Sequence, residues 1–436
     1  MKDRCLVLVT ALLLILLPAV VQAQWTYETN TENTVTITGY DCSSNAVTVP
    51  GTLGGLQVTI IGQDAFYGCL NLTSVVISNG VTEIGGYAFA SCANLTSLLI
   101  PASLTTNGFG IQYDAFYQDT NLTVTIYGNG YIGSDAFQDR ADLTSVIISN
   151  GVTEIDGYAF ASCPNLTSLL IPASLTTNGF AIQYDAFYQD TNLTVTIYGN
   201  GYIGSDAFQD RADLTSVIIS NGVTEINGYA FASCPNLTSL LIPASVNSIG
   251  YEAFEGCAGL TNISVAAANI YYTSVAGVLF DKSQDTLIQC PGGKSGAYTI
   301  PTSITSIDDG AFDDCFGLTA IYFQGNAPGL GSSVFNGDNN LTVYYLPGTT
   351  GWGATFGGVP VVCWNPQAQG LGVQTNQFGF TITGSSNLVI VVEASTNLAN
   401  PVWVPVSTNT LTGGASYFSD PQWTNTPSRF YRFRSP

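Results

Sequence analysis

The chain has 436 residues, of which 30 are Asp or Glu and only 9 are Lys or Arg, so its formal net charge is −21. This charge disfavours nucleic acid and anionic lipid as partners. The chain contains no histidine, which excludes Ser-His-Asp and Cys-His catalytic groups and zinc sites built on imidazole. Its 46 glycines and ten cysteines are typical of an exported chain rich in β-structure.

Residues 1–23 have the features of a cleaved signal peptide. A basic start precedes an apolar run over residues 5–21, and a small-residue exit ends at Ala23, which places the mature start near Gln24. A retained membrane anchor is the alternative. No later apolar run approaches the ~18 to 20 residues needed to span a bilayer. We therefore expect a mature chain without a membrane span, secreted or held at the cell surface.

Residues 24–50 alternate between apolar and polar side chains, which is typical of short strands. The alternation is clearest at residues 34–38 and 46–50. We interpret the segment as a β-hairpin that caps the N-terminal end of a repeat structure, because a terminal repeat must cover an otherwise open apolar face.

A 71-residue block is duplicated in the middle of the chain. Residues 79–149 and 150–220 differ at only three positions, and a third copy begins at Asn221 and diverges after Ser245. Within the block, the dipeptide Ala-Phe recurs every 21 to 27 residues, and a leucine follows each phenylalanine by six positions. The short alternating apolar run after each leucine is typical of a strand. The period predicts a solenoid with one coil per Ala-Phe unit.

Residues 230–249 carry the pattern AFxxCxNLTSLxIPASVxxI. This pattern resembles the BspA-type bacterial leucine-rich repeat, found in surface and secreted proteins. The resemblance extends over roughly residues 25–364, where eleven Ala-Phe or Val-Phe anchors fall in frame. It implies a mainly β fold, with a right-handed leucine-rich-repeat solenoid of stacked short parallel strands at residues 51–364. It also implies a role in adhesion, and it does not imply a reaction.

The position three residues after each anchor phenylalanine is occupied by Cys, Asp or Arg. In two places an aspartate is followed in the next coil by an arginine. Asp119 precedes Arg140 in this way, and Asp190 precedes Arg211. Because adjacent coils place equivalent residues side by side, we predict that these residues form structural ion pairs, in preference to a binding role.

Cysteine occupies the same position in other coils. Cys69 and Cys92 are neighbours in the stack, as are Cys234 and Cys257, whereas Cys163 stands between coils that carry Arg and Asp. Disulfides between neighbours are one interpretation, since an exported location permits them. The lone Cys163 favours the other, in which the position holds a small, buried, free thiol. The cysteine spacings indicate no metal site, and nothing in the sequence indicates a cofactor.

Strand residues that point away from the core define the candidate binding face. Repeat solenoids commonly bind partners on such extended faces, and an aliphatic stripe within this one can bury against a protein. The alternative is that another layer of the same protein covers it. By alternation along the strands, the face comprises Ser74, Val76, Ser97, Leu99, Thr123, Thr125, Tyr127, Ser145, Ile147, Ser168, Leu170, Thr194, Thr196, Tyr198, Ser216, Ile218, Ser239 and Leu241.

Carboxylates also recur with the coils. Aspartate precedes several Ala-Phe pairs, as at Asp64, Asp135 and Asp206, and glutamate recurs in the sequence NGVTEI. A row of acids can coordinate calcium through oxygen ligands. Neither an EF-hand nor a Gly-Asp nonapeptide pattern is present, so we interpret these acids as solvated turn residues or caps and predict no metal site.

The Ala-Phe period breaks after Phe254 and resumes 58 residues later at Phe312. The intervening segment is similar to a variant unit often seen near the end of BspA-type arrays. We expect a strand pair before residue 364 to close the solenoid, with its tryptophans sealing the end.

Residues 365–436 predict a separate small β-sandwich. We interpret residues 367–372 as a linker. The run resembles a terminal module of exported proteins from Verrucomicrobia-like bacteria. Trp403 and Trp423 are interpreted as core residues, with glycan binding as the alternative. Strands are expected at residues 378–383, 388–393, 403–406 and 430–433.

Two functional classes remain. The first is a non-enzymatic secreted or surface protein that recognises a protein or a cell-surface glycan through the candidate binding face. The second is a polysaccharide-active β-solenoid that uses clustered carboxylates. Acids that repeat with the coil argue against the second, and a near-identical duplication suits avidity better than catalysis. A structural role in an envelope or coat is a third possibility.

Overall fold

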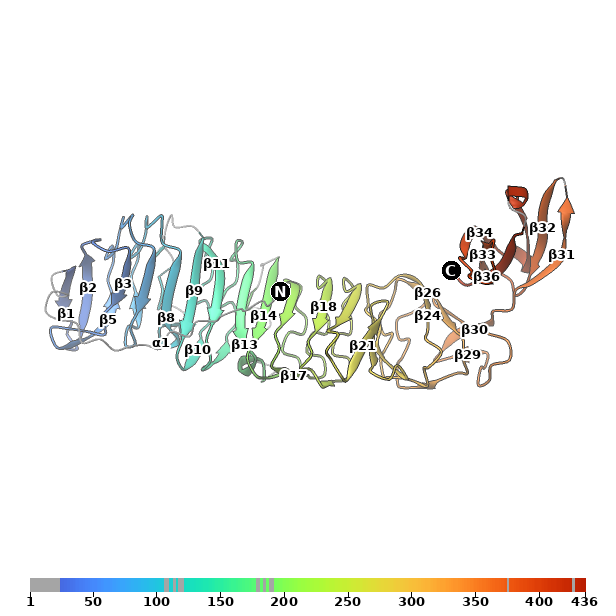
Figure 1. Cartoon of the computed structure of the whole chain (residues 1–436). Helices are drawn as coiled ribbons and strands as arrows, with labels where there is room; N and C mark the ends of the chain where they lie inside the picture. Colours follow the sequence, from blue (N-terminus) through green and yellow to red (C-terminus); the bar gives the residue numbers. More distant parts are fainter. Residues whose placement is uncertain are drawn as a thin grey trace. The chain divides into compact units, whose positions relative to one another are not determined.

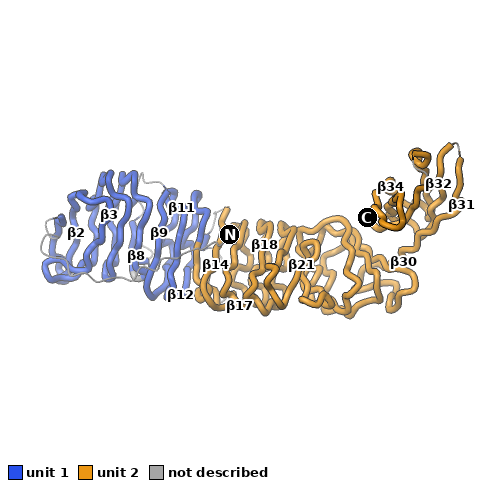
Figure 2. Tube along the Cα trace, viewed as in Figure 1, with its two compact units in different colours: residues 1–169, 185–190 blue, residues 170–184, 191–436 orange. Residues whose placement is uncertain are grey.

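The chain forms two compact units, which Figure 2 shows in different colours. Unit 1 comprises residues 1–169 and 185–190, and unit 2 comprises residues 170–184 and 191–436. The predicted signal peptide lies outside the residues that the structure describes. No helix among those residues is long and apolar enough to cross a membrane. The computed structural model describes residues 24–105, 110–112, 115–116, 121–177, 181–182, 186–187, 192–374, 376–425 and 428–436.

The anchor phenylalanines are buried, and within short runs of coils their rings stack on one another. The ring centroids of Phe66 and Phe89 lie 4.6 Å apart. Those of Phe137 and Phe160 lie 5.1 Å apart, with the rings nearly parallel. All four side chains are buried. The anchor rings therefore form a buried ladder in short runs, and they belong to the core rather than to a ligand site.

Among the described residues, the one before each Ala-Phe or Val-Phe pair has left-handed backbone geometry. The φ angles of Asp64, Asp135 and Asp206 are 58°, 61° and 60°. Aspartate tolerates this conformation better than most residues. These acids are exposed or half-exposed, so the structure confirms their interpretation as solvated turn residues.

Unit 1 contains the N-terminal coils (Figure 1). Its main sheet is parallel, in the order β3-β6-β8-β9-β11, and β10 pairs with β12 in a second, shorter sheet. β13 (Ser168–Pro172) spans the boundary between the units and is followed by the 3-10 helix η2 (Ala173–Thr177). The elements of unit 1 are β1 (Trp25–Thr29), β2 (Val35–Tyr40), β3 (Ala46–Val49), β4 (Thr52–Leu53), β5 (Leu56–Ile61), β6 (Ser74–Ile77), β7 (Glu83–Ile84), β8 (Ser97–Pro101), α1 (Ala102–Thr105), β9 (Leu122–Tyr127), β10 (Gly130–Ile132), β11 (Leu143–Ile148) and β12 (Val152–Ile155).

An antiparallel hairpin is present at the N-terminal end of unit 1, but the strand predicted near residues 46–50, β3, lies outside it and pairs in parallel with β6. β1 pairs antiparallel with β2, which pairs in turn with β5 of the first coil. The hairpin contributes two buried aromatic side chains, Trp25 and Tyr40, whose rings lie 5.8 and 5.1 Å from the ring of Phe66. These rings cover the first phenylalanine of the ladder, which would otherwise be open to solvent.

Unit 2 continues the coils and ends in the C-terminal module. β14, β16, β18 and β20 form one parallel run, and β15, β17 and β19 form another. The later coils form the sheets β21-β22-β23-β25-β27 and β24-β26-β28-β30-β29. The strands of these coils are β14 (Leu193–Tyr198), β15 (Gly201–Ile203), β16 (Leu214–Ile219), β17 (Val223–Ile226), β18 (Ser239–Ile242), β19 (Ser248–Ile249), β20 (Asn262–Val265), β21 (Tyr272–Val275), β22 (Val278–Asp281), β23 (Thr286–Gln289), β24 (Gly296–Thr299), β25 (Ser306–Ile307), β26 (Leu318–Phe323), β27 (Gly329–Leu330), β28 (Thr342–Tyr345), β29 (Thr355–Phe356) and β30 (Val359–Cys363).

The break in the Ala-Phe period corresponds to one coil that lacks the turn. An antiparallel hairpin, β21–β22, is inserted there, and β22 pairs antiparallel with β23. The N–H of Cys290 donates to the carbonyl oxygen of Ala311 across 2.7 Å. In neighbouring coils an anchor phenylalanine makes this bond, as Phe312 does to Val334. The coil at Cys290 therefore stays hydrogen-bonded to the next coil but lacks the Ala-Phe turn of its neighbours.

The C-terminal module consists of two three-stranded antiparallel sheets, β31-β32-β35 and β34-β33-β36. Their facing sides share a core that includes Phe380, Ile390 and Phe418, as the predicted sandwich requires. Trp403 and Trp423 are half-exposed and lie outside this core, so their interpretation as core residues is wrong. The elements are β31 (Gln367–Gln374), β32 (Gln377–Thr383), β33 (Val389–Ser395), β34 (Val404–Thr410), η3 (Thr412–Gly414), β35 (Ala415–Asp420), η4 (Trp423–Asn425) and β36 (Phe430–Arg434).

Two strands of this module were not predicted. β31 occupies the segment interpreted as a linker, and β35 pairs with β32. β31 is rich in Gln and Gly and mostly exposed, so it has no apolar alternation to mark it as a strand. Its pairing with β32 supplies what the local sequence lacks.

Candidate functional site

Two rows of outward-facing side chains cross the main sheet of unit 1. Strand register places Ser97 beside Ser74 and Leu99 beside Val76. The rows continue through the next strands, since Leu99 pairs with Thr125 and Thr125 with Ile147. All of these side chains are exposed or half-exposed, and the residues between them along each strand are buried. The members in unit 1 are Ser74, Val76, Ser97, Leu99, Thr123, Thr125, Ser145 and Ile147.

The duplicated coils place the same rows in unit 2. Thr194 pairs with Ser216, and Thr196 pairs with Ile218. Ile218 and Leu241 are each 53% exposed, a large fraction for aliphatic side chains on an ordered strand. Ser239 is exposed on β18. On β13, Ser168 of unit 1 is exposed and Leu170 of unit 2 is half-exposed.

The two predicted tyrosines are less available than the rest of the face. The hydroxyl of Tyr127 donates to the carbonyl oxygen of Ile77 across 2.8 Å, and burial raises the pKa of Tyr127. Tyr198 is half-buried on β14, and burial raises its pKa as well. The hydroxyl of Tyr127 therefore bonds within the fold, and its side chain as a whole is half-buried.

Of the predicted Asp–Arg pairs, only the arginines can be described, because Asp119 and Asp190 lie outside the described residues. Arg140 is 4% exposed. Its Nη2 donates to the carbonyl oxygen of Gln112 across 2.7 Å. Arg211 is equally buried, and its Nη2 donates to Ile182 across 3.3 Å. Both arginines thus point into the coil, and the ion pairs stay a prediction.

Cysteine thiols occupy the position three residues after several anchors. Cys92, Cys163, Cys234 and Cys257 are buried and carry thiols that are not disulfide-bonded, as the sequence led us to expect. The thiol of Cys92 donates to the carbonyl oxygen of Phe66 across 3.1 Å. A thiol suits the position because it is small and still satisfies the buried carbonyl.

Cys69 departs from that interpretation, because it forms a disulfide with Cys42. Cys42 follows β2 of the capping hairpin and carries none of the repeat pattern. The Cα atoms of the two residues lie 5.2 Å apart, which suits a disulfide. A comparison of equivalent coil positions gave Cys92 as the neighbour of Cys69. Cys42 could not be found in this way, because the cap has no position equivalent to those of the coils.

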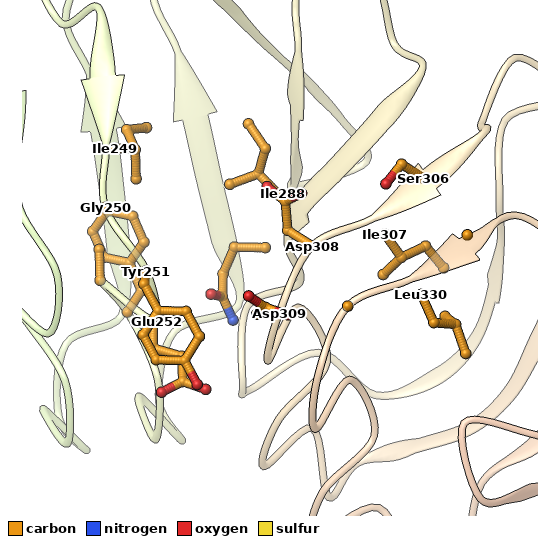
Figure 3. A pocket seen from close by; sticks show the side chains of 15 residues that line it. Ile249, Gly250, Tyr251, Glu252, Ile288, Ser306, Ile307, Asp308, Asp309 and Leu330 are labelled. Carbon is orange, nitrogen blue, oxygen red and sulfur yellow. The ribbon is translucent and has the colours of Figure 1, made fainter.

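A cavity of about 420 Å³ opens beside the coil that lacks the Ala-Phe turn. Figure 3 shows its lining side chains. Strand β19 ends the three-stranded sheet on one side, and β23, β25 and β27 belong to a separate sheet on the other. Apolar lining comes from Ile249, Ile288, Ile307 and Leu330, and polar lining comes from Tyr251, Gln289, Glu252, Asp308 and Asp309.

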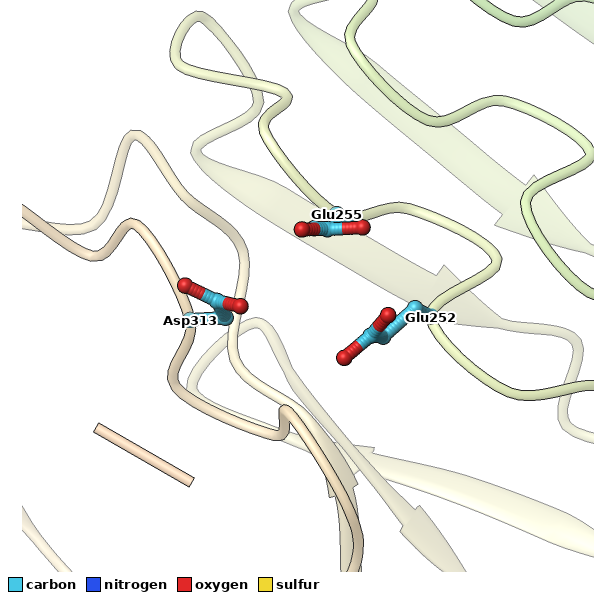
Figure 4. A group of neighbouring side chains, drawn as sticks. All are labelled: Glu252, Glu255 and Asp313. Atoms are coloured by element: carbon cyan, nitrogen blue, oxygen red, sulfur yellow. The ribbon is translucent and has the colours of Figure 1, made fainter. Parts of the chain in front are cut away.

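Three carboxylates converge next to this cavity (Figure 4). Oxygen atoms of Glu252, Glu255 and Asp313 all lie within 4.8 Å of one another. Burial, followed by the charges of Glu252, Asp313 and Asp314, raises the pKa of Glu255 to about 7. Such oxygens are ligands that Ca²⁺ accepts. The cluster is nevertheless only three acids, and an oxygen of Asp313 also accepts a hydrogen bond from the Asn336 amide across 3.1 Å.

The sequence did not single out these three acids. Glu255 and Asp313 each follow an anchor phenylalanine directly, which is a signal that an alignment of the coils contains. Their proximity depends on the intervening coil, which lacks the Ala-Phe turn and so allows the two flanking turns to face each other. A 58-residue gap in the period does not reveal that geometry.

The C-terminal module concentrates the basic residues. Glu393 is buried and bonds to both Arg432 and Arg434, across 2.7 and 2.8 Å. Burial alone would raise the pKa of Glu393, but hydrogen bonds from the two arginines outweigh it and hold the pKa below its usual value. The Arg432 guanidinium also lies 4.6 Å from the ring centroid of Trp403. The contact with Arg432 accounts for the half-exposed position of Trp403, and no ligand is needed to explain it.

Comparisons with known proteins give one family and several solved structures. A family model described as "BspA type Leucine rich repeat region" matches six copies in the chain, over residues 40–130, 59–194, 180–283 and 294–351. No curated protein sequence matches the chain.

The solved structures that are similar to this chain include three bacterial proteins. A leucine rich cell surface protein from Faecalibacterium prausnitzii is 28% identical, covering 73% of this chain and 74% of that one, with a TM-score of 0.34. A leucine-rich repeat protein from Bacteroides ovatus is 22% identical over 74% and 94% of the two chains, with a TM-score of 0.33. The pneumococcal vaccine antigen PcpA is 20% identical over 73% and 67%, with a TM-score of 0.34.

Proposed function

The chain belongs to the BspA-type leucine-rich repeat family, and on this premise we propose that it is a non-enzymatic binding protein, secreted or held at the bacterial surface. The proposed site is the outward-facing pair of rows on the parallel strands. A protein or glycan on another cell or on the bacterial surface is the proposed ligand.

The observation that carries this proposal is the exposed aliphatic stripe within the rows. Ile218 and Leu241 are each 53% exposed on neighbouring strands, although the fold offers buried positions to every other aliphatic residue of those strands. Serine and threonine flank the stripe in the adjacent row. Apolar contact area beside hydroxyl groups is the composition of many recognition surfaces.

The duplication supports recognition of a repeated or extended ligand. The three coils of residues 79–149 recur almost unchanged in residues 150–220, so the chain presents two equivalent sets of contacts. Two linked weak contacts bind a multivalent surface far more tightly than one, because the second contact is intramolecular. Catalysis gains nothing from a second copy of the same turn acids, and those acids are solvated turn residues.

Binding of the fluorescently labelled full chain to intact bacterial and host cells tests the proposal. We expect the double variant Ile218→Lys/Leu241→Lys to lose at least about tenfold in apparent affinity, since two charges replace the apolar stripe. A matched control is Ile270→Lys/Phe316→Lys, which adds the same charge at two exposed apolar positions of unit 2 away from the rows. Equal binding by both variants, or no binding by the unaltered chain, would contradict the proposal.

A further inference from the structure

The cavity of Figure 3 exists because one coil is cut short. β19 is the last strand of its sheet, and β23 belongs to the next sheet. The Ala-Phe turn that would fill the space between them is replaced by the segment at Cys290, whose N–H bonds directly to Ala311. The result is a hollow of about 420 Å³, in the lower part of the size range of small-ligand sites.

One part of the hollow is apolar. Ile249, Ile288 and Leu330 are half-exposed on three different strands, and Ile307 lies buried among them. Half-exposed aliphatic side chains around a hollow favour an occupant with a hydrocarbon part. The stems of arginine and lysine are such groups, and they commonly lie along apolar surface while the charged end reaches a polar group.

The other part of the hollow is acidic. Glu252 is 7% exposed, and Asp308 and Asp309 are exposed at the rim. No lysine or arginine is found among the described residues that line the cavity. The negative potential of these three carboxylates is therefore not neutralised within the cavity, and the net charge of −21 adds a long-range attraction for cationic groups.

An aromatic ring completes the lining. Tyr251 is 45% exposed, and Figure 3 shows its ring beside the Glu252 carboxylate. A guanidinium or ammonium group over the face of a tyrosine ring is stabilised by the ring quadrupole. Together, the apolar side chains, the carboxylates at the rim and the ring of Tyr251 suit an organic cation better than a neutral sugar or an anion.

We propose that this cavity binds an arginine or lysine side chain of a protein partner. The aliphatic stem packs on Ile249, Ile288 and Leu330. The cationic end reaches Glu252 and Asp308, and Tyr251 lies against it. The site is separate from the strand rows and goes beyond the proposed function, since it specifies a basic protein segment as one thing that the chain recognises.

Titration calorimetry with the full chain and a short probe peptide tests the proposal. The probe is acetyl-Gly-Arg-Gly-amide, and its matched control contains citrulline, which keeps the shape of arginine and lacks its charge. We expect saturable binding of the arginine peptide with a Kd near about 1 mM. The citrulline peptide should bind at least about tenfold more weakly, and added salt should weaken the arginine peptide.

Matched variants connect the binding to the cavity. Glu252→Gln and Asp308→Asn should each weaken the arginine peptide at least about tenfold. Asp64→Asn is the control, because Asp64 holds the same coil position as Glu252 in a turn that does not line this cavity. Since Asp308 is exposed, its replacement tests the site even if Glu252→Gln fails to fold. Ile218→Lys/Leu241→Lys should leave peptide binding unchanged. A failure of the cavity proposal can therefore be distinguished from a failure of the proposed cell binding by the strand rows.

Three results would overturn the proposal. One is the absence of saturation with the arginine peptide up to about 10 mM. Another is equal binding of the citrulline peptide or of the Asp308→Asn variant. The last is saturable binding of CaCl₂ alone that displaces the peptide and is lost in Glu255→Gln and Asp313→Asn, which would make the acids a metal site.

Discussion

The thiol of Cys163 donates a hydrogen bond to the carbonyl oxygen of Phe137, the anchor of the preceding coil, across 3.0 Å. Cys234 makes the same bond to Phe208, also across 3.0 Å. In these coils the position therefore suits a small side chain that can donate a hydrogen bond. Asp338 holds the equivalent position after Phe335, and an ionised carboxylate cannot donate.

Replacing Asp338 by cysteine should stabilise the protein at neutral pH. Asp338 is 6% exposed, and neither carboxylate oxygen has a hydrogen-bond partner in the described part of the chain. Burial, then the charges of Asp313 and Asp314, raises its pKa to about 7, although the nearby Cys315 N–H lowers it in part. We expect Asp338→Cys to raise the free energy of unfolding by roughly 1 to 3 kcal/mol at pH 8, the cost of an unsatisfied buried polar group.

The pH dependence provides the check on Asp338. A carboxyl with a raised folded-state pKa holds its proton more tightly in the folded state, so stability falls as pH rises from about 4 to about 7. Urea unfolding of wild type and Asp338→Cys should therefore give a difference that shrinks on going from pH 8 to pH 5. A pH-independent difference would show that the carboxyl is ionised throughout.

Asp142→Asn should also be stabilising. Five residues after the anchor, Asn94 donates to the carbonyl oxygen of Leu70 across 2.7 Å, and Asn165 donates to that of Ala141 across 2.6 Å. Asp142 stands in the same column, its Oδ2 is buried without a partner in the described structure, and burial raises its pKa. An amide should gain about 1 kcal/mol, measured by urea unfolding at pH 8. Asn94→Asp is the converse control and should be destabilising.

Truncating a central anchor should destabilise the solenoid strongly. Phe160 is fully buried and its ring centroid lies 5.1 Å from that of Phe137. Phe160→Ala removes a large buried side chain and leaves a cavity, so we expect a loss of about 3 to 5 kcal/mol in chemical unfolding. Tyr158→Ala, at an exposed site in the same turn, should cost much less. Similar losses in the two variants would contradict the ladder as the main source of stability.

The predicted pair of Asp119 and Arg140 can be tested by a double-mutant cycle. Arg140 is buried, so replacing it alone should leave a carboxylate without its counter-charge and cost about 3 to 5 kcal/mol. Replacing both Asp119 and Arg140 by alanine should cost less than Arg140→Ala alone. Additive effects would mean that the two residues do not interact.

Reduction should destabilise the N-terminal cap. The disulfide between Cys42 and Cys69 closes a segment with a sequence separation of 27 residues, for which the chain-entropy contribution is about 3 to 4 kcal/mol. A thiol reductant should lower the thermal unfolding midpoint of the wild type. Without reductant, Cys42→Ser should already unfold at the lower midpoint of the reduced wild type. Adding reductant should not lower the midpoint of Cys42→Ser further, and a further decrease would indicate a second disulfide.

The repeat and much of its packing could be predicted from the sequence. The Ala-Phe anchors recur in frame and must be buried, so the stack of Phe66 on Phe89 followed from composition and spacing alone. Alternation along the strands was enough to place Val76 and Leu99 side by side on the outward face, since a two-residue period assigns each side chain to one surface.

Contacts between segments that are distant in the sequence could not be predicted in this way. The bond between Cys42 and Cys69 joins the cap to a coil, and β31 is a strand only because β32 lies beside it. Glu255 and Asp313 converge because the coil between them lacks an outward turn. Each of these depends on how much space the backbone leaves between coils, and local periodicity carries no information about that space.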